Sequence, residues 1–250
     1  MKLPLYFISD CHIGMEIDSH EIERRKKLFS VFEQIKQSGG TLIIGGDFFD
    51  FWFHFRNYNP LCYEDVINEL IDLKSNNIDI HYIAGNHDYW DFGFMESKFA
   101  TKFYKEDLLM QIEGSNRDMQ NILITHGDGL LKDDRGYRFM KKIIRSKIFI
   151  KLFKMLGSHL GHKIAQRISN TSRHYNHFDS NADQIKKEMY DFAERKWEEK
   201  FNVVLIGHYH QKGIIEKESK KLIFLGDWLR HFLVTKFDGK KWSQFSWNEG

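Results

Sequence analysis

The sequence predicts an α/β fold, and two patterns in its 250 residues support this prediction. Short apolar runs rich in β-branched residues, typical of buried strands, alternate with longer amphipathic stretches typical of helices. Most of the apolar runs are followed at once by a block of Asp, Asn or His residues. Open α/β sheets bind their ligands at the carboxyl ends of the strands, so we expect the blocks to converge on one crevice at the edge of a single sheet.

The first half of the chain contains three predicted strands and two predicted helices. The strands are expected at 5–8, 41–44 and 80–83, and the helices at 21–37 and 63–75. In the first helix the 3.6-residue period places Ile22 and Leu28 on the core face and Arg24 on the opposite face. Gly39 and Gly40 are expected to end this helix.

The second half adds a strand at 121–125, a long helix at 183–200 and a strand at 202–206. The tail is expected to form antiparallel strands at 221–225, 232–237 and 242–247. Asp238-Gly239 is a strong signal for a hairpin turn between the last two.

A basic segment interrupts this alternation, with eleven Lys or Arg and no Asp or Glu between Arg135 and Phe178. Apolar residues such as Phe139 and Ile143 recur there at helical spacing, so we expect a cationic amphipathic helix. Glycines at 157–161 end it, and a shorter helix is expected at 162–170. We interpret 132–179 as a helical cap inserted into one domain that spans 1–250. A helical hairpin that packs on the core and exposes its basic face to solvent is the simpler alternative.

Cysteine content and hydropathy limit the cellular setting. Cys11 and Cys62 form no CxxC pair and indicate no disulfide framework, which fits a reducing cytosol. The first predicted strand follows Met1 so closely that we expect no secretion signal. No stretch approaches the roughly 18 uncharged apolar residues that a membrane-spanning helix needs. We therefore expect a cytoplasmic protein.

Five short blocks carry the candidate chemistry. They are Ser9-Asp10-Cys11-His12, Gly45-Gly46-Asp47-Phe48-Phe49-Asp50, Gly85-Asn86-His87-Asp88, Thr125-His126-Gly127-Asp128 and Gly207-His208-Tyr209-His210. Each block alone is commonplace, but together they offer the ligands of a two-metal phosphoesterase. Two divalent cations about 4 Å apart acidify a water molecule and neutralise phosphoryl oxygens. Mixed carboxylate, amide and imidazole ligands suit Mn²⁺, Fe²⁺ or Zn²⁺ better than Ca²⁺, and we expect Mn²⁺.

Side-chain alternation in extended backbone divides these ligands between two metals, because the outer residues of Asp-x-His lie on one face. The first metal is expected to bind Asp10, His12 and His210. The second is expected to bind Asn86, His126 and His208. Asp47 would bridge the two metals, since a carboxylate has two oxygens to share.

Three further residues in the blocks have expected roles beside the metals. His87 follows a ligand, so it could face the substrate and protonate the leaving oxygen; a supporting or solvent-exposed role is the alternative. Asp50 and Asp128 are expected to orient ligand imidazoles or backbone groups.

The five blocks, in this order, resemble the pattern of the calcineurin-like metallophosphoesterase family. That pattern is Asp-x-His, Gly-Asp-x-x-Asp, Gly-Asn-His-Asp/Glu, a lone His and Gly-His-x-His, and here it spans residues 9–210. The resemblance implies a four-layer α/β/β/α sandwich around a dinuclear metal centre.

Other segments resemble the branch of this family that acts in lipid A synthesis, namely 46–53, 125–129, 169–173 and 225–228. The resemblance implies hydrolysis of UDP-2,3-diacylglucosamine to UMP and 2,3-diacylglucosamine 1-phosphate, with a metal-bridging hydroxide as nucleophile. It implies substrate contacts at His87, Asp134, Tyr137, Ser172 and Arg173. Many members of this branch carry Arg after the ligand Asn, where this chain has His87.

The basic segment suits such a substrate, because phosphates need cations and acyl chains need apolar surface. Each buried methylene contributes about 0.8 kcal/mol. The same composition suits an anionic bilayer, so we expect peripheral association with the inner face of the inner membrane.

Two other functions stay open. The chain could be another phosphodiesterase or a nuclease of the same fold, although the apolar residues interleaved in the basic segment argue against a nucleic-acid partner. It could also be a non-catalytic scaffold, although no expected ligand is missing.

Overall fold

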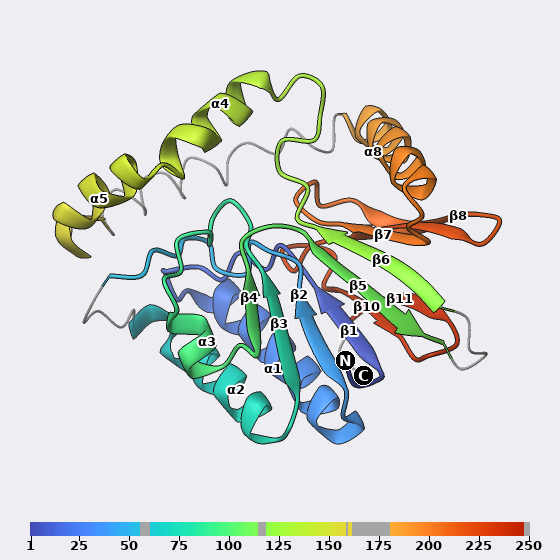
Figure 1. Ribbon diagram of the computed structural model, residues 1–250. Coiled ribbons are helices and arrows are strands. Elements are labelled where there is room, and N and C mark those ends of the chain that lie inside the picture. The colour runs from blue at the N-terminus through green and yellow to red at the C-terminus, as the bar shows by residue number, and fades with distance from the viewer. Residues whose placement is uncertain (56–60, 115–118, 159, 162–180, 248–250) are drawn as a thin grey trace.

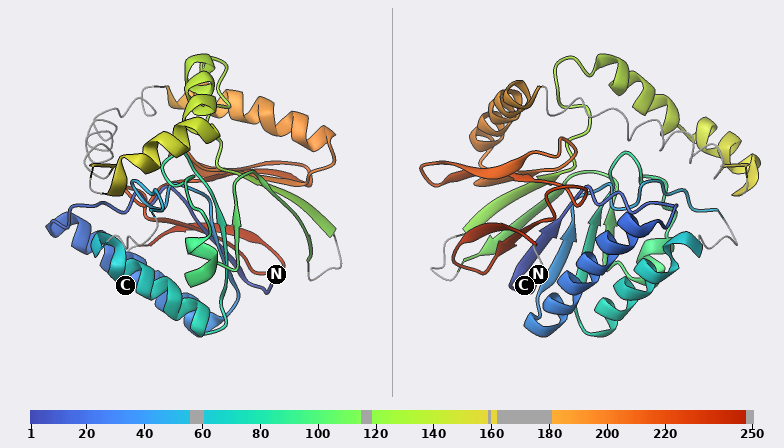
Figure 2. Two further views of the ribbon diagram at one scale, coloured as in Figure 1. Left: turned by 60° about the vertical axis from the view of Figure 1, so that its left-hand side comes forward. Right: turned by 180° about the vertical axis from the view of Figure 1, so that it is seen from behind.

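The computed structural model describes residues 1–55, 61–114, 119–158, 160–161 and 181–247. Two β-sheets pack face to face, and helices cover the outer face of each sheet (Figures 1 and 2). This is the four-layer α/β/β/α arrangement that the family resemblance implied. The expectation of a single sheet is wrong, because the strands that lead into the five blocks are divided between two sheets.

The first sheet has the strand order β11-β10-β1-β2-β3-β4. Its strands are β1 (Leu5–Ile8), β2 (Thr41–Ile44), β3 (Asp79–Ile83), β4 (Lys102–Tyr104), β10 (Leu233–Phe237) and β11 (Trp242–Ser246). Neighbouring strands from β1 to β4 are parallel, whereas β10 is antiparallel to both β1 and β11. The hairpin predicted at Asp238-Gly239 joins β10 to β11. The outer face of this sheet packs against α1 (Ser19–Ser38) and α2 (Glu64–Ser75), and a 3₁₀ turn, η1 (Leu61–Tyr63), and the short α3 (Phe94–Lys98) complete this half.

The second sheet has the strand order β5-β6-β7-β9-β8. Its strands are β5 (Leu108–Glu113), β6 (Met119–Thr125), β7 (Val203–Ile206), β8 (Lys212–Lys217) and β9 (Lys220–Leu225), and α8 (Ala182–Glu198) covers its outer face. The tail strand β9 is parallel to β7 and lies in a different sheet from β10 and β11. The predicted tail of three neighbouring antiparallel strands is therefore correct only for the last two.

Alternating side chains build three apolar layers. In β1, Leu5 lies between the two sheets, whereas Tyr6 packs under α1 and α2. In β7, Leu205 lies between the sheets and Val204 packs under α8. The strands are thus buried on both faces, which explains their continuous apolar runs.

Helix α1 differs from its predicted orientation. Asp18 caps its N-terminus by accepting a hydrogen bond from the Glu21 amide, and Gly39, at φ 70°, follows its end. Ile22, expected in the core, is 41% exposed, whereas Arg24, expected in solvent, is only 4% exposed. The helix is rotated because Arg24 has buried backbone partners, described below.

The basic segment forms two helices where one was expected, α4 (Arg135–Ile144) and α5 (Lys147–Met155). The break falls at Arg145 and Ser146, and the Ser146 hydroxyl caps α5 by accepting from the Phe149 amide at 3.2 Å. In Figure 1, α4 lies above the carboxyl ends of strands of the first sheet, and α5 extends outward beyond β4. The inner side of the cap packs on an aromatic cluster that includes Phe53 and Trp90. The predicted helix at 162–170 lies outside the described residues.

Candidate metal centre

The seven predicted ligands converge at the carboxyl ends of strands from both sheets. Asp10 and His12 follow β1, Asp47 follows β2, Asn86 follows β3, His126 follows β6, and His208 and His210 follow β7. Three groups have ligand atoms within 4.8 Å of one another: Asp10, His12 and His210; Asp47, His126 and His208; and His12, Asp47 and His87. Asn86 joins them through its Oδ1, which lies 3.2 Å from His126 Nε2.

Left-handed backbone, not extended backbone, brings these side chains together. Five of the seven ligands have positive φ angles between 43° and 63°, namely Asp10, His12, Asp47, His208 and His210. Non-glycine residues rarely adopt this conformation, and such residues cluster at functional sites. The side chains that the alternation argument grouped do lie together, but the extended backbone that it assumed is wrong.

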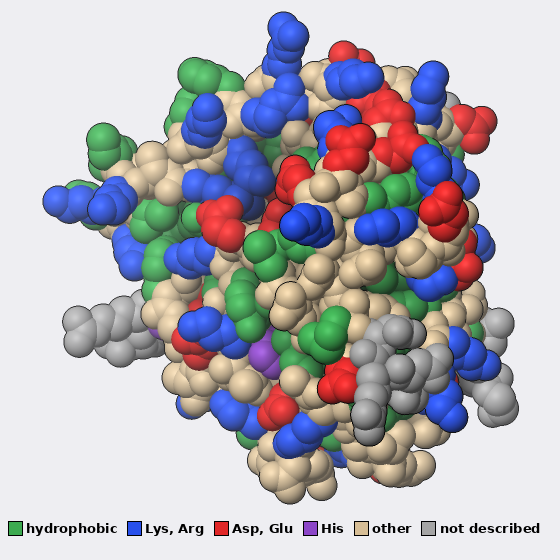
Figure 3. All heavy atoms as spheres, turned by 45° about the vertical axis from the view of Figure 1, so that its right-hand side comes forward, with side chains coloured by type: hydrophobic (Ala, Val, Ile, Leu, Met, Phe, Trp, Pro, Cys, Tyr) green, Lys and Arg blue, Asp and Glu red, His purple; other side chains and the backbone are tan. Residues whose placement is uncertain are grey.

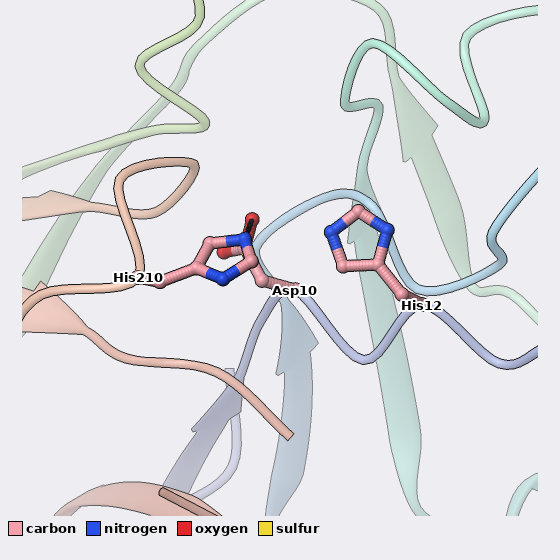
Figure 4. A group of neighbouring side chains, drawn as sticks. All are labelled: Asp10, His12 and His210. Atoms are coloured by element: carbon pink, nitrogen blue, oxygen red, sulfur yellow. Dashed lines mark ion pairs between the residues drawn. The ribbon is translucent and has the colours of Figure 1, made fainter. Parts of the chain in front are cut away.

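The first group is centred on the fully buried Asp10 (Figure 4). Its carboxylate accepts hydrogen bonds from the Ser9 hydroxyl at 2.6 Å and from the His208 amide at 2.9 Å. His210 Nε2 lies 3.5 Å from Asp10 Oδ1. The His12 and His210 rings are 5.4 Å apart between centroids, so the three side chains surround one small space.

Asp47 connects the two groups through one oxygen atom. Its Oδ2 lies 3.3 Å from His126 Nε2 and 3.9 Å from His12 Nε2. Its Oδ1 accepts a hydrogen bond from the His87 amide at 2.8 Å. Asp47 therefore lies within reach of both groups of candidate ligands.

Two glycines make this close approach possible. Gly46 has a φ of 101°, and a Cβ there would collide with the His126 ring. A Cβ on Gly85 would collide with the Asp47 carboxylate. Glycine at both positions lets the loops after β2 and β3 and the His126 side chain meet.

Burial and neighbouring charges shift the pKa values of four groups in the centre. Burial raises the pKa of Asp10 to about 7. Burial opposes a charged imidazole at His126, but the adjacent Asp47 outweighs it and raises the pKa of His126 to about 10. Burial lowers the pKa of His208 and His210 to about 3, so both are neutral and can donate a lone pair. Buried carboxylates beside these two neutral imidazoles fit divalent ions.

Neighbouring groups orient two of the imidazoles. His126 Nδ1 donates to the Gly45 carbonyl at 3.0 Å, which makes Nε2 the candidate ligand atom. Asp50 Oδ1 lies 3.7 Å from His12 Nδ1, the kind of position expected for Asp50. Asp128 instead contacts the cap, where it accepts from the Tyr137 hydroxyl at 2.8 Å and pairs with Lys141 at 2.7 Å.

The residues predicted to contact the substrate differ in how close they lie to the metal centre. The His87 ring packs edge-on against His12 with centroids 4.9 Å apart. Tyr137 lies 6.2 Å from the His208 ring between centroids. Asp134 is the residue before α4, one turn from Tyr137. Ser172 and Arg173 lie outside the described residues.

Two buried residues without a predicted role support the centre. Asp88 accepts from the Phe48 and Gly85 amides, each at 2.7 Å, so it ties the Asp47 loop to the Asn86 loop. Arg24 donates to the Cys11 carbonyl and, at 3.2 Å, to the Trp228 carbonyl. Asp88 lies within a ligand block, which is a usable signal, whereas Arg24 lies on a helix face whose period indicated exposure.

Comparison with known proteins identifies the family of this chain. Residues 3–212 match the family model described as calcineurin-like phosphoesterase. This chain belongs to that family. Its members work with divalent metal ions, and the groups around Asp10 and Asp47 are candidate sites for them.

Curated relatives match most of the chain. A protein of Porphyromonas gingivalis named UDP-2,3-diacylglucosamine hydrolase is 22% identical over 96% of this chain and 95% of its own length. A protein of Proteus mirabilis with the same name is 30% identical over 70% of this chain and 69% of its own length. The family and these relatives make the chain a hydrolase.

The solved structures that match this chain are more distant in sequence. A novel archaeal phosphodiesterase is 15% identical, with a TM-score of 0.44 over 97% of this chain and 99% of that one. GAP50 of Plasmodium is 12% identical, with a TM-score of 0.49 over 99% of this chain and 86% of that one.

Proposed function

We propose that the chain hydrolyses the pyrophosphate bond of UDP-2,3-diacylglucosamine, yielding UMP and 2,3-diacylglucosamine 1-phosphate. The observation that carries the proposal is the pair of ligand groups joined at Asp47 beneath a cap that is both cationic and apolar. The names of the relatives that match most of the chain point to the same substrate.

Two divalent ions, Mn²⁺ by preference, would occupy the centre. Asp10, His12 and His210 would hold one, Asn86, His126 and His208 the other, and Asp47 both. Bound there, the ions supply an acidified water and neutralise phosphoryl oxygens. His87 would donate a proton to the leaving oxygen or a hydrogen bond to a phosphoryl oxygen. Tyr137, Asp134, Ser172 and Arg173 remain proposed substrate contacts, as the cap at 132–179 remains a proposed insertion.

The cap offers surface for both parts of the substrate. A hollow of about 500 Å³ beside α5 is lined by Phe92, Lys147, Ile150, Lys151, Lys154 and Met155. Lys154 Nζ lies 3.6 Å from the centroid of the Phe92 ring, so cations and apolar groups alternate along its wall. Burial of even part of an acyl chain against such a wall contributes about 0.8 kcal/mol for each methylene.

The test is hydrolysis of UDP-2,3-diacylglucosamine by purified, Mn²⁺-loaded protein, with UMP and the lipid 1-phosphate separated by chromatography. We expect both products in equal amounts and none from protein stripped with a chelator. Intact substrate, together with rapid cleavage of simple phosphodiesters or of nucleic acid, would show a different phosphoesterase. Inactivity toward every phosphoester would favour a non-catalytic scaffold.

The exposed side of the cap would also dock on an anionic bilayer. Phe139, Ile148, Leu152 and Met155 have between 58% and 75% of their surface exposed. At the upper left of Figure 3, on the side where the cap helices lie, Lys and Arg side chains project among hydrophobic ones. Apolar side chains between cations suit insertion at the level of lipid headgroups. No described helix is both long and apolar enough to cross a membrane.

Sedimentation with vesicles tests this docking. The protein should bind vesicles that contain phosphatidylglycerol more tightly than vesicles of phosphatidylcholine alone, and added salt should weaken the binding. Replacing Ile148 and Leu152 together by Ser should reduce it. Equal binding to both kinds of vesicle would contradict an electrostatic contribution.

A further inference from the structure

Arg145 is a cation of the cap that reaches the edge of the metal centre. It lies at the break between α4 and α5, where Trp90 Nε1 holds the neighbouring Ile144 carbonyl at 3.1 Å. Its Nη2 lies 3.3 Å from the Gly85 carbonyl and 3.4 Å from Asp128 Oδ2. Gly85 directly precedes Asn86, and Asp128 follows His126 by two residues. The guanidinium therefore lies between two ligand-bearing loops.

The guanidinium is oriented but weakly held. Its Cζ lies over the Tyr89 ring, 3.9 Å from the ring centroid, so the ring contacts one side of the group. Both of its hydrogen bonds are long and both use Nη2, and among the described residues Nε and Nη1 have no hydrogen-bond partner. Only 16% of the side chain is exposed. The N–H groups on Nε and Nη1 are therefore unused, and turning from Asp128 would let Nη2 form a paired donor edge with one of them for two oxygens of a phosphoryl group.

The neighbouring Lys141 is already paired with Asp128. Its Nζ pairs with Asp128 Oδ2 at 2.7 Å and donates to the Asp128 carbonyl at 3.1 Å. Asp128 also accepts from Tyr137, so this carboxylate is satisfied without Arg145. Arg145 can therefore turn from Asp128 toward a substrate without leaving a buried charge unpaired.

We propose that Arg145 binds the second phosphoryl group of a pyrophosphate substrate, the group that leaves, while the centre around Asp47 holds the phosphoryl group that is attacked. This assignment rests on the proposed function. Negative charge grows on the leaving phosphate as the P–O bond breaks, and a fixed guanidinium stabilises that charge in the transition state. Arg145 thereby favours pyrophosphates over diesters whose leaving group carries no phosphate.

The test compares two substrates in one variant. Arg145→Gln should lower kcat/KM for UDP-2,3-diacylglucosamine by about 10²–10³-fold. It should leave the cleavage of bis(p-nitrophenyl) phosphate nearly unchanged, because that diester has no second phosphoryl group. Arg145→Lys, which keeps the charge and loses the fork, should be intermediate. Lys142→Gln on an exposed position of α4 is the matched control and should leave both reactions unchanged.

Binding supplies a readout that is independent of turnover. In titrations of the Mn²⁺-loaded protein with the product 2,3-diacylglucosamine 1-phosphate in detergent, which carries the leaving phosphate and is not cleaved, Arg145→Gln should weaken binding by about 10-fold or more. Equal losses on both substrates would mean that Arg145 only supports the fold, and no loss on either would mean that it contacts no phosphate; both outcomes overturn the inference. A wild-type protein that cleaves the diester but not the UDP-lipid would instead refute the proposed function.

Discussion

A hydrogen bond to the Asp50 carbonyl determines which ring nitrogen of His87 carries a proton. His87 Nδ1 lies 2.5 Å from the Asp50 carbonyl, and a carbonyl can only accept, so Nδ1 carries a proton. Nε2 is then the nitrogen left to act on a substrate. The ring also lies against His12, within the metal centre. In the imidazolium form, which carries a proton on both nitrogens, Nε2 can donate a proton to the leaving oxygen or a hydrogen bond to a phosphate, beside the metal ligands.

Replacing His87 by Ala should slow turnover and retain the metals. Loss of a general acid typically costs 10²–10⁴-fold in rate, so we expect a fall in kcat of about that size. Kinetics and metal analysis of the same preparation measure both effects. The exposed His20 provides the matched control, as His20→Ala. Normal turnover in His87→Ala would remove this residue from the mechanism.

Asp47→Ala, unlike His87→Ala, should lose bound metal as well as turnover. Since Asp47 Oδ2 faces both ligand groups, its loss should lower the occupancy of both ions and abolish turnover. Metal content per chain after dialysis is the measurement, and Asp72→Ala on the surface of α2 is the control. Two ions retained per chain would show that Asp47 does not bridge.

At the scale of elements, α1 acts as a support for the metal-binding loop as well as a packing helix. Arg24 pairs with Glu21 at 2.6 Å and donates to carbonyls of the loops that contain Cys11 and Trp228. The Trp228 amide in turn donates to the Asp10 carbonyl at 3.1 Å. One buried guanidinium thus joins a helix to two loops beside the first group of ligands.

Arg24→Met should destabilise the protein strongly, because it leaves Glu21 Oε2 and the Cys11 and Trp228 carbonyls buried without this donor, although Arg25 still pairs with Glu21 Oε1. Breaking a buried pair typically costs about 3–5 kcal/mol, measurable as the free energy of unfolding in urea. Lys26→Met is a matched control on the same helix. Lys26 pairs with Glu23 at the same i,i+3 spacing, but its side chain is 63% exposed, so stability should change little. Similar losses in both variants would contradict the proposed support.

For the whole molecule, folding brings carboxylates and imidazoles from two sheets into one buried space. Asp10, with a pKa near 7 above its usual 3.8, favours its protonated form, so metal-free stability falls as the pH rises from about 3.8 to 7. His126, with a pKa near 10 above its usual 6.5, contributes stability that is complete below 6.5 and lost as the pH rises toward 10. Metal ions need both groups deprotonated, so they bind more tightly as the pH rises.

The stabilisation by Mn²⁺ should therefore increase with pH. We expect the rise in Tm on adding a fixed excess of Mn²⁺ to be larger at pH 8 than at pH 6, because fewer protons must be displaced. Thermal unfolding with and without metal at each pH measures this difference. A metal-induced shift that is constant, or that shrinks with pH, would contradict the titration of this centre.

Strands that correspond to a short continuous apolar run could be predicted from the sequence. The runs at 5–8, 41–44 and 203–206 are buried on both faces, so they read as strands without knowledge of their neighbours. The ligand blocks follow such strands, and strand ends are where loops carry chemistry. The order of the blocks was enough to indicate the family.

Structural features that depend on contacts between residues far apart in the chain could not be predicted from the sequence. The division into two sheets, the burial of Arg24 and the break at Arg145 are set by residues far along the chain, such as Trp228 and Trp90. Left-handed backbone at Asp10 and His12 is favourable only when the surrounding loops hold it.

By itself, the sequence determined which side chains could bind metal and which strands carry them, because hydrophobic period and residue chemistry are local properties. Only the tertiary structure decided how two sheets face each other, which oxygen of Asp47 meets both histidines, and which cation of the cap lies beside Gly85. Those are distances between residues far apart in the chain, and packing alone fixes them.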